Sequence, residues 1–207
     1  MLSDNIAFYL LKNEYIEENE LPIYKYGLSG FINSLSQTLI IMLLGIVTDS
    51  VMETIVFLLV LSSVRRFLGG YHAKTKARCM IMDISMWWGT TYTCEIYSKY
   101  NMCAITFIIC IFSLYVTCRY APVENIHKPL SEYQRKHNGR KGRTLVCIFL
   151  AIAVIVMKSS IEIAGTILTT LILVDIFVLV DRRENVKRKN MQIFEENRRG
   201  NSKKNSK

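Results

Sequence analysis

Long apolar runs alternate with charged clusters along the 207 residues of this chain. Several runs reach the length of about 20 residues that a helix needs to cross the hydrocarbon core of a bilayer. Because lipid offers no hydrogen-bond partner to a free backbone group, we expect every run to be helical. The pattern predicts an all-α polytopic membrane protein with about six transmembrane helices, at residues 27–48, 51–64, 80–97, 102–118, 144–157 and 161–181. The runs at 51–64 and 144–157 are short, so they either tilt, recruit flanking residues or dip into the membrane without crossing it.

The first residues of the chain carry an amphipathic pattern. Within residues 1–26, the side chains of Ile6, Leu10 and Leu11 share one helical face, and several glutamates follow them. We expect a short interfacial helix that lies on the membrane surface and is terminated by Pro22. A soluble lid or a dimer element fits the same pattern, and the sequence does not separate these alternatives.

The last residues of the chain differ from the rest. Residues 182–207 are charged and poor in large apolar side chains, which predicts a basic cytoplasmic tail without regular structure beyond Glu196. No internal repeat or compositional break divides the chain. We therefore expect one membrane-embedded domain over residues 1–207.

Positive charge is distributed unevenly between the two sides of the predicted membrane protein. The chain is 51% hydrophobic with a formal net charge of +9. If all six runs span, 24 of the 26 Lys and Arg residues fall on one side, in residues 1–26, 65–78, 119–143 and 182–207. The positive-inside rule then places both termini and the 65–78 connection in the cytoplasm. Attraction to anionic lipid explains most of this charge, and an acidic substrate is the alternative. No nucleic-acid motif accompanies the basic residues, so we expect no nucleic-acid partner.

Candidate chemistry lies at the end of the 65–78 connection. Cys79 follows His72 by seven residues. A thiol attacks as its thiolate, so near neutral pH it needs a base or a local positive field. His72 offers the base, and positive charge on the approach to Cys79 comes from Lys74, Lys76 and Arg78. The run therefore predicts a thiol active site at a membrane surface.

The spacing of the two residues restricts how the run folds. Seven residues along a straight helix rise about 10 Å, which is too far for a hydrogen bond. Gly69 and Gly70 would let the chain bend, so that His72 folds back over a helix that begins near Cys79. On that helix Asp83 would share a face with Cys79, where it would either orient His72 or act as a helix cap.

The other cysteines carry no metal pattern. None of the six cysteines falls in a C-x-x-C or another zinc-type spacing, and most lie inside apolar runs, where a cysteine behaves as a small hydrophobe. No metal-binding carboxylate cluster is evident at the predicted interface. We therefore expect neither a metal site nor a cofactor.

A Gly-Gly-x-His run, a cysteine seven residues after the histidine and the preceding pair Arg65 and Arg66 form a recognisable set. With six hydrophobic segments and a length near 200 residues, this set resembles the accessory gene regulator B (AgrB) family, membrane cysteine endopeptidases of Gram-positive quorum-sensing systems. The resemblance covers essentially the whole chain, and its specificity rests on residues 65–79. It implies that His72 is the catalytic base and Cys79 the nucleophile.

The resemblance also implies a reaction and a setting. The substrate would be an AgrD-like propeptide with an amphipathic leader, a signal sequence containing Cys or Ser, and an acidic carboxy-terminal tail. Cys79 would release the tail through an acyl-enzyme thioester, and the propeptide's own side chain would then close a thiolactone or lactone ring. A homodimer in the cytoplasmic membrane of a Gram-positive bacterium is implied in the same way.

Five basic residues near the reactive run are candidates for binding the acidic tail: Arg65, Arg66, Lys74, Lys76 and Arg78. Support of the fold is the alternative for all five, and snorkelling from the end of an apolar helix is an equally good reading for the arginine pair.

Three other classes of protein fit parts of the sequence. A peptide transporter or a non-catalytic scaffold would tolerate replacement of Cys79. A lipid-modifying enzyme would need the carboxylate cluster that the sequence lacks.

Overall fold

The chain folds into a bundle of helices. The computed structural model describes residues 2–68, 76–100, 103–123 and 131–204, and no strand occurs among them. Its helices are α1 (Leu2–Lys12), α2 (Leu21–Val47), α3 (Val51–Leu68), α4 (Lys76–Tyr100), α5 (Cys103–Tyr120), α6 (Glu132–Val156) and α7 (Ile161–Lys204). The all-α prediction is confirmed. Each of the six apolar runs overlaps one of the helices α2 to α7.

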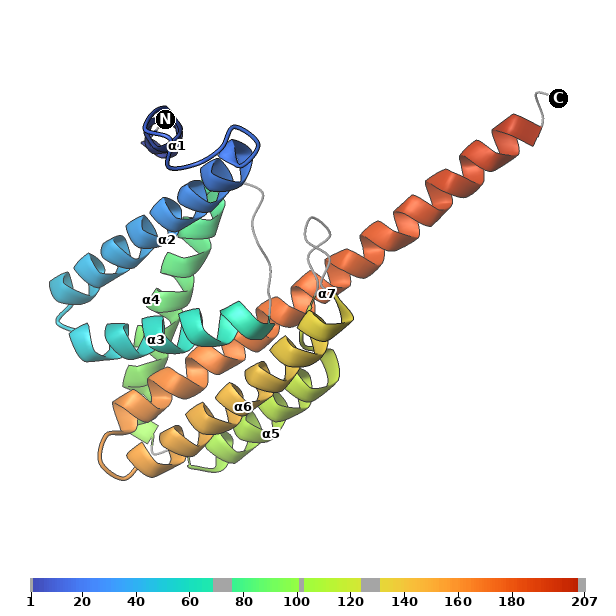
Figure 1. Ribbon diagram of the computed structural model, residues 1–207. Helices are drawn as coiled ribbons and strands as arrows, with labels where there is room; N and C mark the ends of the chain where they lie inside the picture. Colours follow the sequence, from blue (N-terminus) through green and yellow to red (C-terminus); the bar gives the residue numbers. More distant parts are fainter. Residues whose placement is uncertain (1, 69–75, 101–102, 124–130, 205–207) are drawn as a thin grey trace.

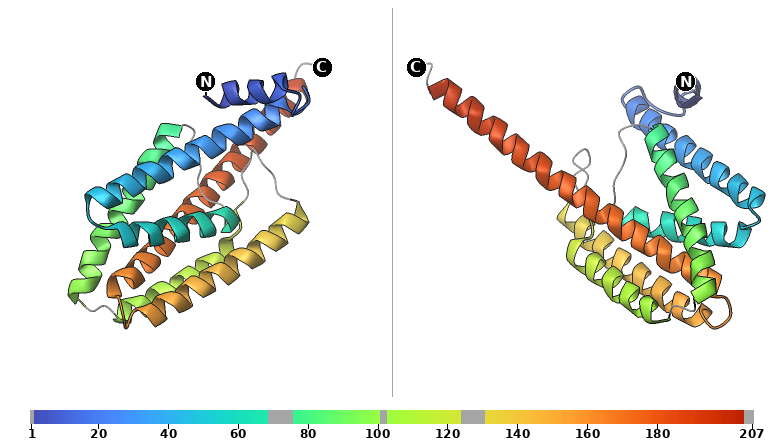
Figure 2. Two further views of the ribbon diagram at one scale, coloured as in Figure 1. Left: turned by 60° about the vertical axis from the view of Figure 1, so that its left-hand side comes forward. Right: turned by 180° about the vertical axis from the view of Figure 1, so that it is seen from behind.

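Helix α7 is the centre of the bundle. Figures 1 and 2 show it running diagonally through the molecule, and it packs against α3, α4, α5 and α6. Its inward side chains Leu168, Leu171 and Val178 are buried together with Phe57 of α3 and Val146 of α6. This shared core holds α3, α5 and α6 around α7.

Helix α2 is the most loosely packed of the long helices. Only Ile41 and Gly45, in its second half, are buried. Helix α1 lies against α2, and on the other side α2 faces α3 and α4 (Figure 1). The arrangement makes α2 a wall at the edge of the bundle.

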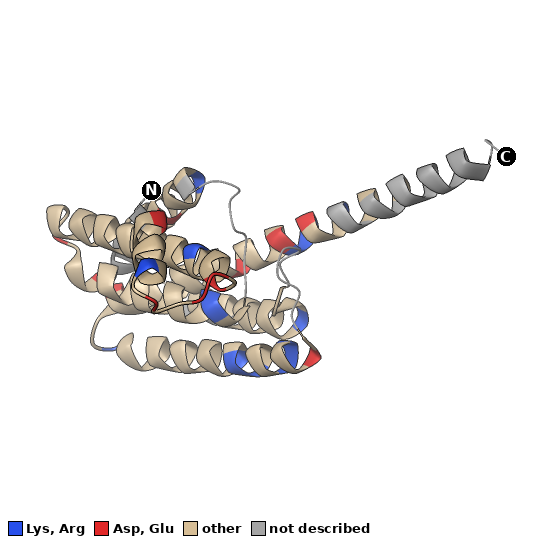
Figure 3. Cartoon of the chain, turned by 45° about the horizontal axis from the view of Figure 1, so that its top comes forward, with Lys and Arg blue, Asp and Glu red and all other residues tan. Residues whose placement is uncertain are grey.

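Two helical segments are long and apolar enough to cross a membrane. They are Leu21–Val47 and Ile161–Lys187, each 27 residues long, in the part of the chain that the structure describes. Charged residues are sparse along most of the bundle and gather towards helix ends (Figure 3). A crossing by α3, α4, α5 and α6 stays a prediction.

The end of α1 and the start of α2 differ from the sequence-based prediction. Pro22 was expected to end the interfacial helix, but α1 ends at Lys12 and Pro22 lies in the first turn of α2. Proline suits that place because its fixed φ is helical and the first helical turn has no use for its missing N–H. The apolar run at 27–48 therefore begins six residues inside its helix.

The start of α6 was also missed. Residues 132–143 belong to α6, although they were read as part of a polar connection. The helix starts at a capping box, in which Ser131 Oγ accepts a hydrogen bond from the Gln134 N–H and Gln134 Oε1 accepts one from the Ser131 N–H, both at 3.2 Å. These bonds satisfy N–H groups that would otherwise be free at the helix start. The cap explains how a basic, glycine-containing stretch becomes helical.

Regular structure continues further at the carboxy terminus than expected. The chain was predicted to lose regular structure beyond Glu196, but α7 remains helical to Lys204 and projects away from the bundle (Figures 1 and 2). Lys, Arg, Glu and Gln are good helix formers, and a helix that is already nucleated in the bundle propagates at little cost.

Candidate functional site

A cavity of about 950 Å³ opens between α2 and the rest of the bundle. Its wall on one side is α2 and on the other α3, and Cys79 and Asp83 of α4 close one end. The lining changes character along its length. Ile41, Met42 and Ile55 make one end apolar, whereas the end at Cys79 is polar and charged. The cavity therefore joins a thiol to an apolar binding space.

Cys79 occupies the first turn of α4. The helix begins at Lys76, which confirms the prediction of a helix start near Cys79. The thiol is partly exposed and lines the cavity. Free backbone N–H groups at a helix start create a partial positive charge, and Cys79 lies within the turn where that field acts.

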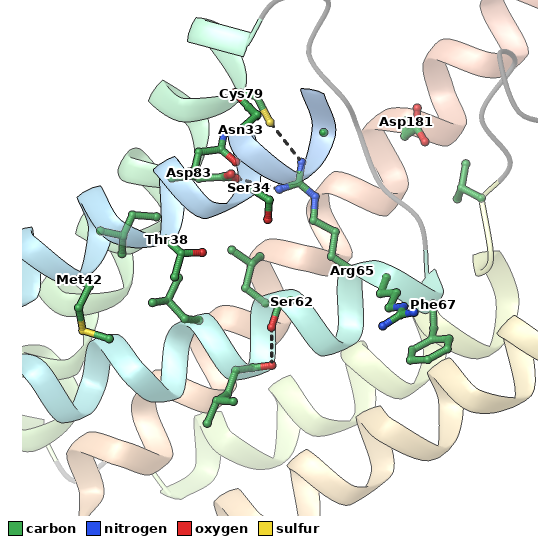
Figure 4. A pocket seen from close by; sticks show the side chains of 18 of the residues that line it. Asn33, Ser34, Thr38, Met42, Ser62, Arg65, Phe67, Cys79, Asp83 and Asp181 are labelled. Atoms are coloured by element: carbon green, nitrogen blue, oxygen red, sulfur yellow. Dashed lines mark hydrogen bonds and ion pairs between the residues drawn. The ribbon is translucent and has the colours of Figure 1, made fainter. Parts of the chain in front are cut away.

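Arg65 links Cys79 to a buried carboxylate. Its Nη1 donates to Asp83 Oδ1 at 2.8 Å, and its Nη2 lies 4.0 Å from Cys79 Sγ (Figure 4). The Asp83 side chain is 8% exposed and the Arg65 side chain 19%. A carboxylate this buried needs a paired cation, and the planar guanidinium can serve two neighbours at once. The ion pair thus holds the charged head of Arg65 beside the sulfur.

The geometry removes one alternative for each of these two residues. Asp83 shares a face with Cys79, as predicted, but it is the eighth residue of α4 and therefore too far along the helix to cap it. Snorkelling of Arg65 towards solvent is wrong, because its guanidinium turns inward to Asp83. Sequence reasoning missed the pair, since its members are 18 positions apart in the sequence and belong to different helices.

Of the remaining candidate residues, Arg66 lines the cavity, two others lie on the first turn of α4, and four lie outside the described residues. Arg66 is exposed at the cavity rim, with its guanidinium carbon 6.0 Å from the centre of the Phe67 ring. Arg78 is exposed on the first turn of α4 and is not among the described residues that line the cavity. Lys76 begins α4. Outside the described residues lie Gly69, Gly70, His72 and Lys74, so the structure does not place the histidine relative to Cys79.

A polar face of α2 was not anticipated. Asn33, Ser34, Gln37 and Thr38 line the cavity opposite α3. They recur at the spacing of one helical turn inside an otherwise apolar segment, which places them on one face. That spacing was a readable signal in the sequence, because a lipid-facing helix has no use for two amide side chains.

No metal site emerges from the described part of the chain, where no three His, Cys, Asp or Glu side chains gather closely enough to hold an ion. What the site offers is a thiol, a guanidinium held by a carboxylate, and a binding space. That set is suited to nucleophilic attack by sulfur on a bound electrophile.

The family profile of AgrB, accessory gene regulator B, matches residues 3–179. The chain belongs to the AgrB family. The matched region contains all of the cavity's lining except Asp181, and it contains both Cys79 and the Arg65–Asp83 pair.

Two curated relatives from Clostridium perfringens also carry the family name. "Putative AgrB-like protein 2" of strain 13 / Type A is 27% identical over 139 residues, covering 64% of this chain and 65% of that protein. "Putative AgrB-like protein" of strain SM101 / Type A is 26% identical over the same shares. The chain thus spans about 65% of the length of each relative. No solved structure matches the chain.

Proposed function

We propose that this AgrB-family chain is a membrane cysteine endopeptidase that removes the acidic tail of an AgrD-like propeptide and promotes ring closure of the product. The observation that carries the proposal is Cys79, which sits at a helix start, faces a cavity of about 950 Å³ and has Arg65 Nη2 4.0 Å from its sulfur. Family membership supports the choice of substrate.

In the first step the Cys79 thiolate attacks the carbonyl carbon at the junction between signal and tail. His72 takes the thiol proton and then gives it to the departing amine as the C–N bond breaks. The tail leaves with a new amino terminus, and the rest of the propeptide stays on Cys79 as a thioester.

In the second step a Cys or Ser side chain of the bound propeptide attacks the thioester carbonyl. His72, neutral again after the first step, takes the proton of the attacking thiol or hydroxyl. The new thioester or ester bond closes a ring as the bond to Cys79 breaks, and Cys79 leaves as thiolate beside the protonated His72. Water must be kept away during this step, because hydrolysis would give a linear peptide. The internal nucleophile succeeds through its high effective concentration. A cavity that the bound propeptide fills serves both requirements.

Arg65 has the position of an electrostatic support for this chemistry. A fixed guanidinium attracts a neighbouring thiolate more strongly in a partly buried site than in water. Asp83 fixes the guanidinium by an ion pair to Nη1, and Nη2 is the nitrogen near the Cys79 sulfur. We therefore assign Arg65 and Asp83 to positioning of charge at the nucleophile, with Asp83 acting through Arg65.

The setting of the reaction is part of the proposal. The enzyme would work as a homodimer in the cytoplasmic membrane of a Gram-positive bacterium, with six spanning helices and with both termini and Cys79 on the cytoplasmic side. The excess of Lys and Arg in the connections on that side supports this orientation. Arg66 at the cavity rim is placed to meet the acidic tail.

The test is intact-mass analysis of an AgrD-like propeptide mixed with the enzyme in liposomes. We expect release of the tail and a product that is one water lighter than the linear cleaved peptide. Cys79→Ala and His72→Ala should abolish both. Cys147→Ala is the matched control, because Cys147 is exposed on α6 and does not line the cavity. Equal processing by Cys79→Ala would refute the proposal in favour of a transporter or a scaffold.

A further inference from the structure

The polar face of α2 suggests how a peptide is held beside Cys79. Resting on the function proposed above, we propose that Asn33 and Gln37 bind the main chain of the extended substrate segment that precedes the scissile bond. The site is the α2 wall of the cavity, and its ligand is a peptide backbone.

The position of the two amides supports this role. Asn33 lies at the same end of the cavity as Cys79 and Asp83 (Figure 4), and Gln37 follows one turn further along α2. One helical turn of four residues rises about 6 Å. Two residues of an extended peptide advance about 6.6 Å. Amides at this spacing therefore meet main-chain groups of alternate residues of an extended peptide lying along α2.

Gln37 also has an unsatisfied hydrogen-bonding group. Its Nε2 is shielded from solvent, and among the described residues none provides it with an acceptor. A buried donor without a partner is unfavourable, so a ligand carbonyl that accepts from it gains stability. The terminal torsion of a glutamine is broad, and a small rotation turns the amide towards the cavity that the side chain lines.

The cavity lining changes from charged near Cys79 to apolar near Ile41, and this change indicates which part of the substrate lies along α2. Beyond Gln37 the lining becomes apolar at Ile41 and Met42, where an acidic tail would lose its hydration without compensation. Arg65 and Arg66 stand at the opposite end. The tail therefore belongs at the charged end, and the segment that becomes the acyl group belongs along α2.

The test uses alkylation of Cys79 by acetyl-Leu-Leu-Phe chloromethyl ketone and by the same compound with an E-alkene in place of the Leu-Leu peptide bond, which removes the carbonyl acceptor. The thiolate displaces chloride in both cases, so each adduct is read by intact mass. We expect the enzyme to react about ten-fold faster with the compound that keeps the peptide bond. Gln37→Leu and Asn33→Leu should each lower that rate about ten-fold, which corresponds to about 1.4 kcal/mol, and Gln37→Leu should reduce the preference between the two compounds.

Two controls separate this inference from the proposed function and from misfolding. Iodoacetamide reports the reactivity of the thiol alone, and its rate should not change in either variant. Ser36→Ala should behave as the unmodified enzyme, because Ser36 is exposed and bonds its own helix through the Ile32 carbonyl at 2.8 Å. If the peptidyl rates stay unchanged in Gln37→Leu and Asn33→Leu while Cys79→Ala still abolishes processing, the inference is overturned and the proposed function stands.

Discussion

The indole Nε1 of Trp87 donates a hydrogen bond to Thr54 Oγ1 at 2.8 Å, and both residues are fully buried. The bond joins α4 to α3 at the end of the cavity remote from Cys79. Thr54 is also in close contact with Gly45 of α2, where a Cβ would lie 2.8 Å from the Cβ of Thr54. Three helices thus meet at one small group of side chains.

Replacing Trp87 by Phe should destabilise the fold. The change removes the hydrogen bond and leaves a void where the indole packed, at a cost of about 2–4 kcal/mol. We expect a lower melting temperature in detergent. Trp88→Phe is the matched control, since Trp88 is 65% exposed and its change should move the melting temperature little. Equal effects of the two would contradict this account of Trp87.

Arg65→Met and Asp83→Asn should both slow the reaction of Cys79 with iodoacetamide at pH 7. Each change removes the fixed positive charge from the sulfur, directly or by releasing the guanidinium. We expect each variant to react several-fold more slowly and the double variant to be no slower than Arg65→Met, because the two act as a unit. Arg66→Met, one residue away and exposed, should react at the normal rate. Additive losses in the double variant would show that Asp83 does not act through Arg65.

How much of this site the sequence predicts depends on the separation of the residues. Cys79 and Asp83 are four residues apart, and helical periodicity alone placed them correctly on one face. Arg65 comes from another helix, and its direction depends on how α3 and α4 cross. Local sequence patterns do not predict how two helices cross, so the Arg65–Asp83 ion pair could be identified only from the structure.

The helices follow the same division. Apolar runs predicted every helix from α2 to α7, because a helix that is buried in lipid or in the protein core consists mostly of apolar residues. The start of α6 was missed since its first turns are basic, and Ser131 sets the boundary by its cap. The extent of α7 beyond Glu196 was missed because charged composition was read as disorder, whereas the helix continues from a buried nucleus.

Ser131→Ala should loosen the first turn of α6. Loss of the cap leaves the Gln134 N–H without its partner and costs about 1 kcal/mol. Faster amide exchange confined to the first turns of α6 is the expected readout. Ser131→Asp keeps a capping oxygen and should preserve the slow exchange. If Ser131→Asp exchanged as fast as Ser131→Ala, the cap would not be what fixes this boundary.

Gly142→Ala and Gly89→Ala make a matched pair with opposite expectations. A Cβ at Gly142 would overlap Leu68 Cδ2 of α3, whereas nothing lies within 4 Å of a Cβ at Gly89. We expect Gly142→Ala to destabilise by about 1–3 kcal/mol through overpacking. Gly89→Ala should stabilise by about 0.5–1 kcal/mol, because alanine is the better helix former. Thermal unfolding in detergent compares the two, and a gain in stability from Gly142→Ala would contradict the close approach of α6 to α3.

The sparse packing of α2 has a mechanical consequence. Its fully buried residues are Ile41 and Gly45, and neither lies in the part of the helix that carries Asn33 and Gln37. Helix α2 is held most tightly where Gly45 contacts Thr54, so we expect this contact to act as a hinge. The first half of α2 can then move away from α4, which widens the cavity beside Cys79. A bulky guest then enters at the cost of α2 contacts alone, and the core around α7 stays as it is.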